Sequence, residues 1–267
     1  MLQLIAVDVD GTLINSRGEI TAPVREAIHR LNMNDLQISI VSGRNTLGVE
    51  SIMAQLGLNG WCISSGGALT INSLTGEVLE RHLLDRSDAE VVIRTGREGH
   101  TGMLLEQALQ LFWEGPRPFI PDIIDLEKIQ LHIVEDLLQV LQTEPLKLVL
   151  VKDHTALMEM EAKLRQLDLD INLVYSAPHY LEITRRGVTK GAALANLARF
   201  LGIPAERVAA VGDGENDISM FEVAGLAIAM GNAAPQVQQA ADLVAPSNDQ
   251  DGLVWALKVV EEQFEPR

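Results

Sequence analysis

The stretch Leu4-Ile5-Ala6-Val7-Asp8-Val9-Asp10-Gly11-Thr12 places two carboxylates between a run of apolar, strand-forming residues and a glycine turn. Successive side chains of a strand point to opposite faces, so positions i and i+2 share a face and Asp8 and Asp10 are expected to converge. Two converging carboxylates repel each other unless a cation lies between them. The stretch therefore predicts a site for a hard divalent ion such as Mg²⁺ at the end of a strand.

Two other structures share this short pattern. A polar turn that closes a strand has the same composition, so the motif alone does not decide. A calcium loop of the EF-hand type also begins Asp-x-Asp, but it requires glycine at its sixth position, where this chain has Leu13, and a helix in front of it. The EF-hand is excluded, and the rest of the chain has to decide between a turn and a metal site.

Composition limits the class of protein. A chain of 267 residues with 47% hydrophobic content can form one sizeable domain and a smaller one, and a net charge of −16 gives no basic face for nucleic acid. Cys62 is the only cysteine, so an internal disulfide is excluded and a reducing cytoplasm is favoured. The early aspartates interrupt any signal-peptide core and no apolar run approaches about 18 residues, so we expect a soluble cytoplasmic protein without a membrane partner.

The chain alternates strand-like and helix-like segments near both ends. Such alternation is typical of βαβ units around a parallel sheet, and we expect the two ends to share one sheet. The predicted segments are strands at 4–9, 37–41, 61–64, 207–211, 227–230 and 243–245, with helices at 22–31, 46–56 and 192–201.

The pattern changes in the middle of the chain, where apolar runs are paired and interleaved with helical segments at 129–141 and 155–167. Paired runs at 104–113, 148–151 and 171–175 and a proline cluster at 116–121 predict an α+β insertion, entered after a hairpin at 69–79 with a Thr75-Gly76 turn. The predicted division is a core at 1–82, a cap at 83–181 and the second part of the core at 182–267.

Three further elements stand at predicted loop or helix starts. Ser42-Gly43-Arg44 offers a hydroxyl, backbone N–H groups and a cation to an oxyanion, although alone it also fits a capped helix start. Thr189-Lys190-Gly191 begins a helical run, where a single lysine is commonly a solvated residue. Gly212-Asp213-Gly214-Glu215-Asn216-Asp217 has the composition of a metal loop and lacks the third glycine of a dinucleotide fingerprint. Because ligands of open α/β sheets collect at the carboxyl ends of strands, the elements predict one site.

In this order along the chain, the four elements resemble the motif set of the haloacid dehalogenase (HAD) superfamily, specifically the Cof-type phosphatases with a C2-type α+β cap between the second and third motifs. The resemblance extends to Leu181-Glu182-Ile183-Thr184 before the lysine motif and to Ala229-Met230-Gly231-Asn232-Ala233 and Ser247-Asn248-Asp249-Gln250-Asp251-Gly252-Leu253 after the metal loop. It spans nearly the whole chain. The fold it implies is an α/β, Rossmann-like parallel-sheet core with an inserted α+β cap.

The resemblance implies a Mg²⁺-dependent phosphomonoester hydrolase acting on a small phosphorylated metabolite, such as a sugar phosphate or a phosphorylated cofactor. Asp8 is expected to be the nucleophile that forms an aspartyl-phosphate, and Asp10 the acid/base. The expected Mg²⁺ ligands are Asp8, the backbone carbonyl of Asp10, and Asp213. Thr12 and Asp217 are expected to support these groups, with Asp217 orienting Lys190 or a metal-bound water. The expected phosphate-binding residues are Ser42, Gly43, Arg44, Lys190 and Asn216.

One departure and two alternatives stay open. Gly66-Gly67-Ala68 stands where many Cof-type members have Asn-Gly-Ala, so the contact of the missing amide is in doubt. A phosphosugar mutase of the same superfamily also uses a nucleophilic aspartate. A receiver-like signalling module that binds phosphate without turnover also combines acids, a hydroxyl and a lysine, although it needs neither a leaving-group acid at Asp10 nor a large insertion.

The cap side of the site is the part that the sequence describes least. No pattern singles out a substrate-facing residue there, and both a monomer and a homodimer are compatible with the sequence. The candidates are the larger polar and aromatic side chains Trp113, Arg117, His132, Tyr175, His179 and Tyr180.

Overall fold

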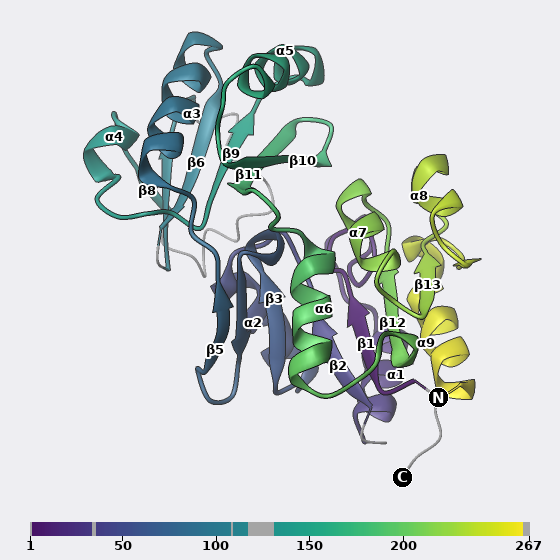
Figure 1. Cartoon of the computed structure of the whole chain (residues 1–267). Coiled ribbons are helices and arrows are strands. Elements are labelled where there is room, and N and C mark those ends of the chain that lie inside the picture. The colour runs from purple at the N-terminus through teal and green to yellow at the C-terminus, as the bar shows by residue number, and fades with distance from the viewer. Residues whose placement is uncertain (1, 34–35, 108, 117–130, 264–267) are drawn as a thin grey trace.

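The computed structural model describes residues 2–33, 36–107, 109–116 and 131–263, and it has two lobes (Figure 1). Both ends of the chain build the lower lobe in that view, and the middle of the chain builds the upper lobe. We call them the core and the cap. This is the α/β core with an inserted α+β unit that the sequence predicts.

The core sheet has five parallel strands in the order β14-β13-β12-β1-β2. β1 pairs with β12 from Leu4 opposite Val208 to Val7 opposite Val211, so the two ends of the chain share one sheet as predicted. The strands are β1 (Leu4–Val7), β2 (Gln37–Ile40), β12 (Val208–Gly212), β13 (Leu226–Ala229) and β14 (Leu243–Val244).

A second, antiparallel sheet continues from the edge of the core sheet. β3 (Trp61–Ser64) lies next to β2 through a parallel bridge between Val41 and Ile63, and it pairs with β4 (Leu69–Asn72), which pairs with β5 (Val78–Arg81). The predicted hairpin with its turn at Gly76 is therefore present. It leads directly into the cap.

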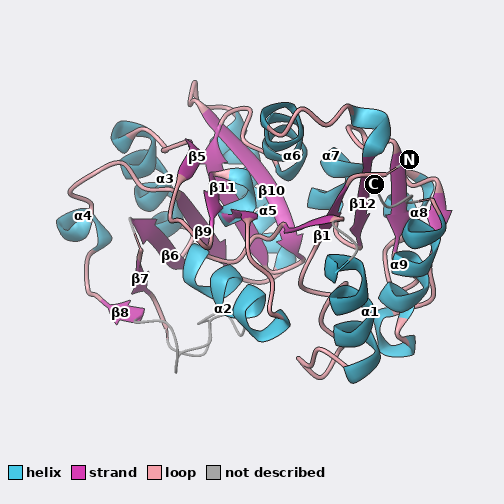
Figure 2. Ribbon diagram, turned by 90° about the horizontal axis from the view of Figure 1, so that it is seen from below, coloured by secondary structure: helices cyan, strands magenta, loops and turns pink. Residues whose placement is uncertain are grey.

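Helices cover both faces of the core sheet (Figure 2). Side chains of β1 point alternately to the two faces, and all of them are apolar, so each face presents apolar surface to helices. Ile5 and Val7 pack with α1 (Ala22–Met33), α2 (Thr46–Leu56) and α9 (Gly252–Glu262), whereas Leu4 and Ala6 pack on the opposite face. The helices of that opposite face are α6 (Lys190–Phe200), α7 (Ile218–Phe221) and α8 (Pro235–Gln239). Because both faces of these strands are buried, their sequences do not alternate between polar and apolar residues and are continuous apolar runs.

The cap is a six-stranded sheet in the order β10-β11-β9-β6-β7-β8 with helices on one face. Its other face turns toward the core. The strands are β6 (Gly102–Gln107), β7 (Gln110–Glu114), β8 (Leu131–Ile133), β9 (Lys147–Val151), β10 (Ile171–Ala177) and β11 (Tyr180–Arg185); the helices are α3 (Arg86–Glu98), α4 (Leu137–Val140) and α5 (His154–Arg165).

The predicted helix at 129–141 is wrong over most of its described length. Leu131–Ile133 form β8, which pairs with β7, and only Leu137–Val140 are helical, starting at the Asp136 cap. Backbone pairing along an existing sheet outweighs helical spacing in so short a segment. The proline cluster at 116–121 lies outside the described residues except for Pro116.

The cap ends later in the chain than the predicted residue 181. β11 pairs with β9 and β10 and runs to Arg185, so residues 182–185 belong to the cap sheet rather than to the core. One strand pairs along its whole length, and the division therefore falls after it. The structure also adds α3, for which no helix is predicted from the sequence. Within the described ranges, every helix is too short or too polar to cross a bilayer.

Candidate active site

The two early aspartates lie on one pocket but in different environments. β1 ends at Val7, and the chain turns so that Asp8 is 4% exposed, whereas the Asp10 side chain is 45% exposed. Both line a pocket between core and cap with a cavity volume of about 120 Å³. The turn after β1 therefore places both aspartates on the pocket, but the acids that cluster with Asp8 among the described residues are Asp213 and Asp217 rather than Asp10.

Lys190 is the centre of the buried ionic contacts. Its Nζ donates to Asp8 Oδ1 and to Asp217 Oδ1, both at 2.6 Å, and the lysine is 3% exposed. It is the first residue of α6, after the Thr189 cap. Burial places this lysine in the site rather than in solvent, so the interpretation as an ordinary surface lysine is wrong.

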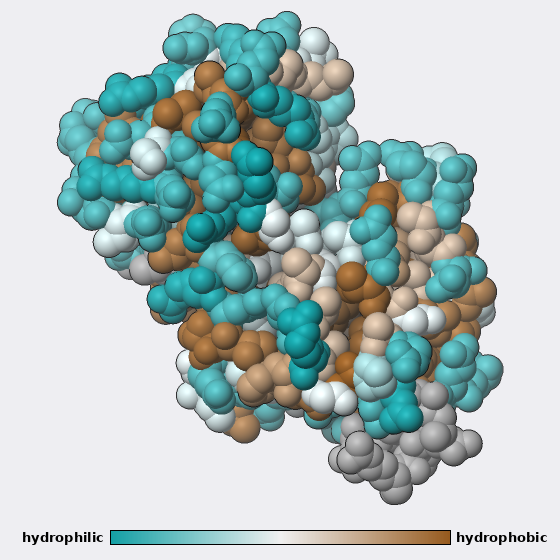
Figure 3. All heavy atoms as spheres, viewed as in Figure 1, coloured by the Kyte–Doolittle hydropathy of each residue, from teal (hydrophilic) through white to brown (hydrophobic). Residues whose placement is uncertain are grey.

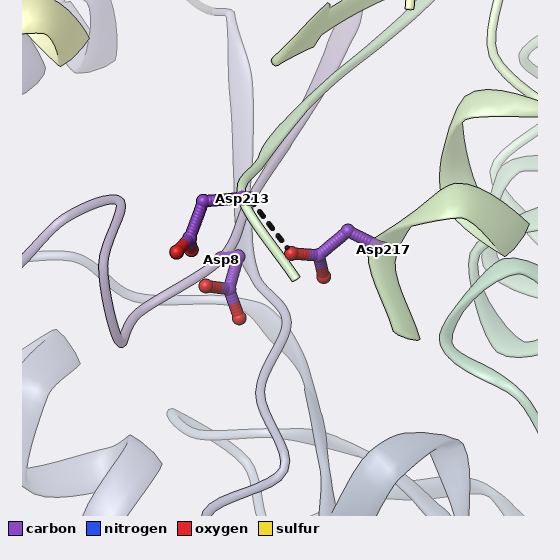
Figure 4. A group of neighbouring side chains, drawn as sticks. All are labelled: Asp8, Asp213 and Asp217. Atoms are coloured by element: carbon purple, nitrogen blue, oxygen red, sulfur yellow. Dashed lines mark hydrogen bonds between the residues drawn. The ribbon is translucent and has the colours of Figure 1, made fainter. Parts of the chain in front are cut away.

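Asp217 holds the metal-loop backbone. Its Oδ2 accepts hydrogen bonds from the N–H groups of Asp213 and Gly214, both at 2.9 Å, and its Oδ1 accepts from Lys190 (Figure 4). Its Oδ2 thus accepts from two backbone donors and its Oδ1 from an ammonium group, whereas each oxygen of Asp213 accepts from a single neutral side chain. This favours a supporting role for Asp217 over direct metal binding.

Asp213 lies beside Asp8 at the ends of neighbouring strands (Figure 4). Thr12 Oγ1 donates to its Oδ1 at 3.0 Å, and Asn232 Nδ2 donates to its Oδ2 at 3.1 Å. A Cβ on Gly11 would lie 2.1 Å from Asp213 Oδ2, so only glycine fits there. The loop after β1 and the loop after β12 are thus packed directly against each other.

The cluster carries more negative than positive charge. Oxygens of Asp8, Asp213 and Asp217 lie within 4.8 Å of one another, and Lys190 is the one cation that bonds to them among the described residues, which leaves a formal charge of −2. Burial, followed by the charge of Asp217, raises the pKa of Asp213 to about 7. Burial and Asp217 also raise the pKa of Asp8 well above its ordinary value, although Lys190 opposes this.

A divalent cation fits this donor set. Carboxylate oxygens are the ligands that Mg²⁺ prefers, and two positive charges balance the excess of the cluster. Asp8 and Asp213 are the side chains that can supply oxygens. The side chain of Asp10 turns away to Arg44, so its predicted role as a metal ligand concerns its backbone carbonyl and stays a prediction.

Arg44 holds Asp10 at the pocket mouth. Its Nε and one terminal NH₂ group donate to the two Asp10 oxygens at 2.9 and 2.6 Å. The backbone N–H of Arg44 donates to Ser42 Oγ at 3.0 Å. These bonds therefore join the loop after β1 to the loop after β2.

The cap forms the opposite wall of this pocket. Ser176 and Ala177 from β10 and Tyr180 and Glu182 from β11 line it together with the core residues, and Figure 3 shows a notch between the two lobes. The core residues on the pocket share polar or flexible character: Asp8, Asp10, Gly43, Arg44, Lys190, Asp213, Gly214, Asn216 and Asp217.

A second cavity of about 110 Å³ adjoins the first, since Glu182, Lys190 and Asn216 line both. We call it the side pocket. Its further lining residues are Gly66, Asn172, Val174, Thr184, Val188, Thr189, Glu215 and Ser219.

Gly66 explains one departure from the family pattern. It has φ +70°, and a Cβ at this position would lie 3.4 Å from Glu182 Oε2. A side chain at this position starts beside the side pocket, so glycine leaves that space open for a ligand.

Among the cap candidates, Tyr180 reaches the pocket. Trp113 is fully buried in the cap, His132 stacks on Phe112, and Tyr175 packs against His154. His179 contacts Tyr180, and Arg117 lies outside the described residues. The sequence reasoning missed Glu182 and Asn232 as site residues, although both stand in stretches that carry the family resemblance.

Residues 5–257 match the family model of the haloacid dehalogenase-like hydrolases. Phosphatase YwpJ of Bacillus subtilis strain 168 is 30% identical over 285 aligned residues, which cover 96% of this chain and 99% of that protein. The 5-amino-6-(5-phospho-D-ribitylamino)uracil phosphatase YcsE of the same strain is 28% identical over 96% of this chain and 95% of its own length. A haloacid dehalogenase-like hydrolase from Bacteroides thetaiotaomicron has a similar structure, with a TM-score of 0.87 at 30% identity over 97% of this chain and 100% of that chain.

Proposed function

This chain belongs to the haloacid dehalogenase-like hydrolases and is a phosphatase of that family, and we propose that it hydrolyses phosphomonoesters of small metabolites with Mg²⁺ through an aspartyl-phosphate on Asp8. The observation that carries the proposal is the buried Asp8 carboxylate. It is bonded to Lys190, lies beside Asp213, and faces a pocket with Asp10 at its mouth. A carboxylate held in this way is oriented for attack on a phosphoryl group.

The proposed first half-reaction breaks the ester bond. An Asp8 oxygen attacks phosphorus, the bond from phosphorus to the ester oxygen breaks in line with it, and Asp10 gives a proton to the leaving oxygen. Lys190, the Ser42 hydroxyl, the Gly43 N–H and Asn216 bind the other phosphoryl oxygens. When bound between Asp8 and Asp213, Mg²⁺ neutralises negative charge next to the phosphoryl group.

The second half-reaction restores Asp8. Asp10, now a carboxylate, takes a proton from a water whose oxygen attacks phosphorus, and the bond to Asp8 breaks with release of inorganic phosphate. Arg44 orients Asp10 for both proton transfers, since it contacts both oxygens. Asp10 therefore acts as the acid in the first half-reaction and as the base in the second.

The pocket favours a small leaving group without a second anion. The side pocket is lined by Glu182 and Glu215, amides, hydroxyls and two valines, and its single cation is Lys190, which already contacts two carboxylates. The relative YcsE is named for a phosphorylated ribityl compound, a polyol phosphate. Both observations support sugar or polyol phosphates as the substrate class. The cytoplasmic location and the monomer or homodimer state stay predictions.

The test is phosphate release from sugar phosphates, nucleotides, flavin mononucleotide and pyridoxal phosphate, each with Mg²⁺ and with EDTA. We expect turnover with Mg²⁺ on at least one sugar or polyol phosphate and none with EDTA. Conversion of a sugar 1-phosphate to its 6-phosphate without phosphate release would show a mutase instead. One phosphate bound per chain from acetyl phosphate, with no turnover, would show a receiver-like module.

A further inference from the structure

The loop Ser42-Gly43-Arg44 has each of its three backbone carbonyls hydrogen-bonded. Gly66 N–H donates to the Ser42 carbonyl at 3.0 Å, and Ser65 N–H donates to the Arg44 carbonyl at 2.8 Å. These two bonds come from the core. The middle carbonyl, that of Gly43, accepts from Lys147 Nζ, which belongs to the first residue of β9 in the cap.

The amide groups of the loop show what this bond controls. The carbonyl of Gly43 and the N–H of Arg44 belong to one planar peptide unit and point in opposite directions. Lys147 holds the carbonyl end, and the N–H end donates to Ser42 Oγ at 3.0 Å. Because Ser42 Oγ accepts this bond, its own proton is left to donate elsewhere. Within the described part of the chain the Gly43 N–H has no acceptor.

Lys147 makes this contact with its charged side chain buried, which costs free energy of desolvation. It is 3% exposed, and its Nζ also lies 3.2 Å from Glu182 Oε2, which is buried too. Glu182 packs on the other side of the same loop, since a Cβ on Gly43 would lie 2.9 Å from Glu182 Oε1. Glu106, opposite Lys147 in the sheet, accepts from Ser65 Oγ at 2.7 Å.

Lys147 bonds to the Glu182 carboxylate and to a loop carbonyl, and the buried carboxylate of Glu106 lies opposite it. Such a buried group of charges needs an explanation, because apolar residues of similar volume commonly pack as stably. Lys147 also lies outside the ten residues that the motifs assign to the site. The bond to Gly43 crosses from the cap to the core, so it is not required to close the cap sheet itself.

We propose that Lys147 is a positioning residue for phosphate binding: from the cap, it fixes the peptide unit between Gly43 and Arg44, whose N–H bonds to Ser42 Oγ, so that the Ser42 hydroxyl proton faces the phosphoryl oxygens. This inference rests on the proposed function, since it deepens the role of the same loop. It makes phosphate affinity depend on a residue of the cap.

The main variants are Lys147→Met and the double variant Lys147→Met/Glu182→Gln, which also removes the charge of the carboxylate that bonds to Lys147 and leaves Glu106 with its hydrogen bond from Ser65. We expect both to raise KM and the Kd of inorganic phosphate by the same factor, about tenfold, because hydrogen bonds made by charged donors are among the stronger ones. The pH profile of kcat should stay unchanged. A loss of folded enzyme would instead lower the apparent kcat and leave KM unchanged.

The matched control is Lys152→Met. Lys152 follows the same strand, and its Nζ donates to the Gly99 carbonyl at 2.6 Å, a bond of the same kind that stays within the cap. This variant should keep the KM and phosphate Kd of the wild type. Lys147→Arg, which keeps the charge, should recover part of the loss.

A double-mutant cycle tests the route through Ser42. If Lys147 acts by orienting that hydroxyl, Lys147→Met should change phosphate Kd less in a Ser42→Ala background than in the wild type. Phosphate Kd is measured by calorimetry with Mg²⁺ and needs no turnover. A wild-type phosphate Kd and KM in the double variant overturn the inference alone, whereas a wild type that neither binds phosphate nor releases it overturns the proposed function as well.

Discussion

The two walls of the pocket are built differently. On the core wall, the polar side chains that approach the phosphate position are tied to neighbours: Asp8 and Asp217 to Lys190, Asp213 to Thr12 and Asn232, and Asp10 to Arg44. On the cap wall, all seven residues of β10 are half-buried, and the Ser176 hydroxyl has no hydrogen-bond partner within the described residues. The core wall is organised in advance for one reaction, and the cap wall leaves the Ser176 hydroxyl for a ligand to satisfy.

This difference between the walls indicates that the core wall carries the catalytic groups and that the cap wall contributes to substrate selectivity. Pre-organised charges lower a barrier because they need no rearrangement during the reaction, so residues that serve them are held by several bonds. Selectivity depends on the shape of the pocket and on its polar groups, which form hydrogen bonds with the correct ligand and are left without partners by a wrong one. The predictions below separate the two walls.

Asp8→Asn should have the largest effect, a loss of kcat on the order of 10³-fold or more, since removing a nucleophile removes the pathway through the covalent intermediate. Phosphate release measures it, and mass spectrometry of quenched protein should find phosphate on the wild type only. Asp168→Asn, an exposed acid of the cap, is the control and should match the wild type. An active Asp8→Asn enzyme would contradict the assignment of the core wall.

Charge on the leaving group should have the next largest effect, because the leaving group meets the side pocket, which Glu182 of the cap and Glu215 of the core both line. Glucose 6-phosphate should have a kcat/KM at least about tenfold above that of 6-phosphogluconate, whose extra carboxylate meets Glu182 and Glu215 without a free cation. Steady-state kinetics with both substrates gives the ratio. Glu215→Gln should narrow it, and equal values for both substrates in the wild type would argue against an acidic side pocket.

Gly66→Asn should have a smaller, size-dependent effect. Asparagine tolerates the φ of +70° at this position, and its Cβ makes an ordinary contact at 3.4 Å with Glu182, so the variant should fold. The added amide narrows the side pocket, and we expect a several-fold lower kcat/KM for a sugar phosphate and little change for acetyl phosphate. If both substrates respond equally, Gly66 serves the loop rather than the pocket.

The smallest expected effect is that of Mg²⁺ on thermal stability, and it should vary gradually with pH. The pKa of Asp213 is raised to about 7, so the folded state holds this proton more tightly than the unfolded state does. The metal-free protein should therefore lose stability as pH rises from about 4 toward 7, the interval between the unfolded and folded pKa values. Mg²⁺ should raise the Tm more at pH 8 than at pH 5, as measured by thermal denaturation with Mg²⁺ or EDTA. The same Tm difference at both pH values would mean that Asp213 does not bind the ion.

The sequence by itself determined the core and its loops. Short apolar runs that are rich in β-branched residues and end at turns favour buried strands, and the acids and the hydroxyl follow such runs. Local order along the chain therefore already favours one edge of a parallel sheet. Asp8 and Asp213 could be placed at this edge on that basis, whereas Lys190, which fits a solvated helix start equally well, was assigned through the family resemblance. The segment at 129–141 could not be assigned locally, because the neighbour that turns Leu131–Ile133 into a strand is β7, and pairing between strands is not a local property.

Tertiary structure alone decided the cap side and its link to the core. Lys147 begins a strand of apolar residues, and nothing in its neighbourhood along the chain marks it as different from a solvated lysine. Its role appears only when a carbonyl 104 residues earlier in the chain lies against it. The physical reason is that catalytic groups in this fold follow strands of the core sheet at positions that the sequence marks. The cap wall is made by residues of the cap strands, and their partners are set by how the two lobes meet.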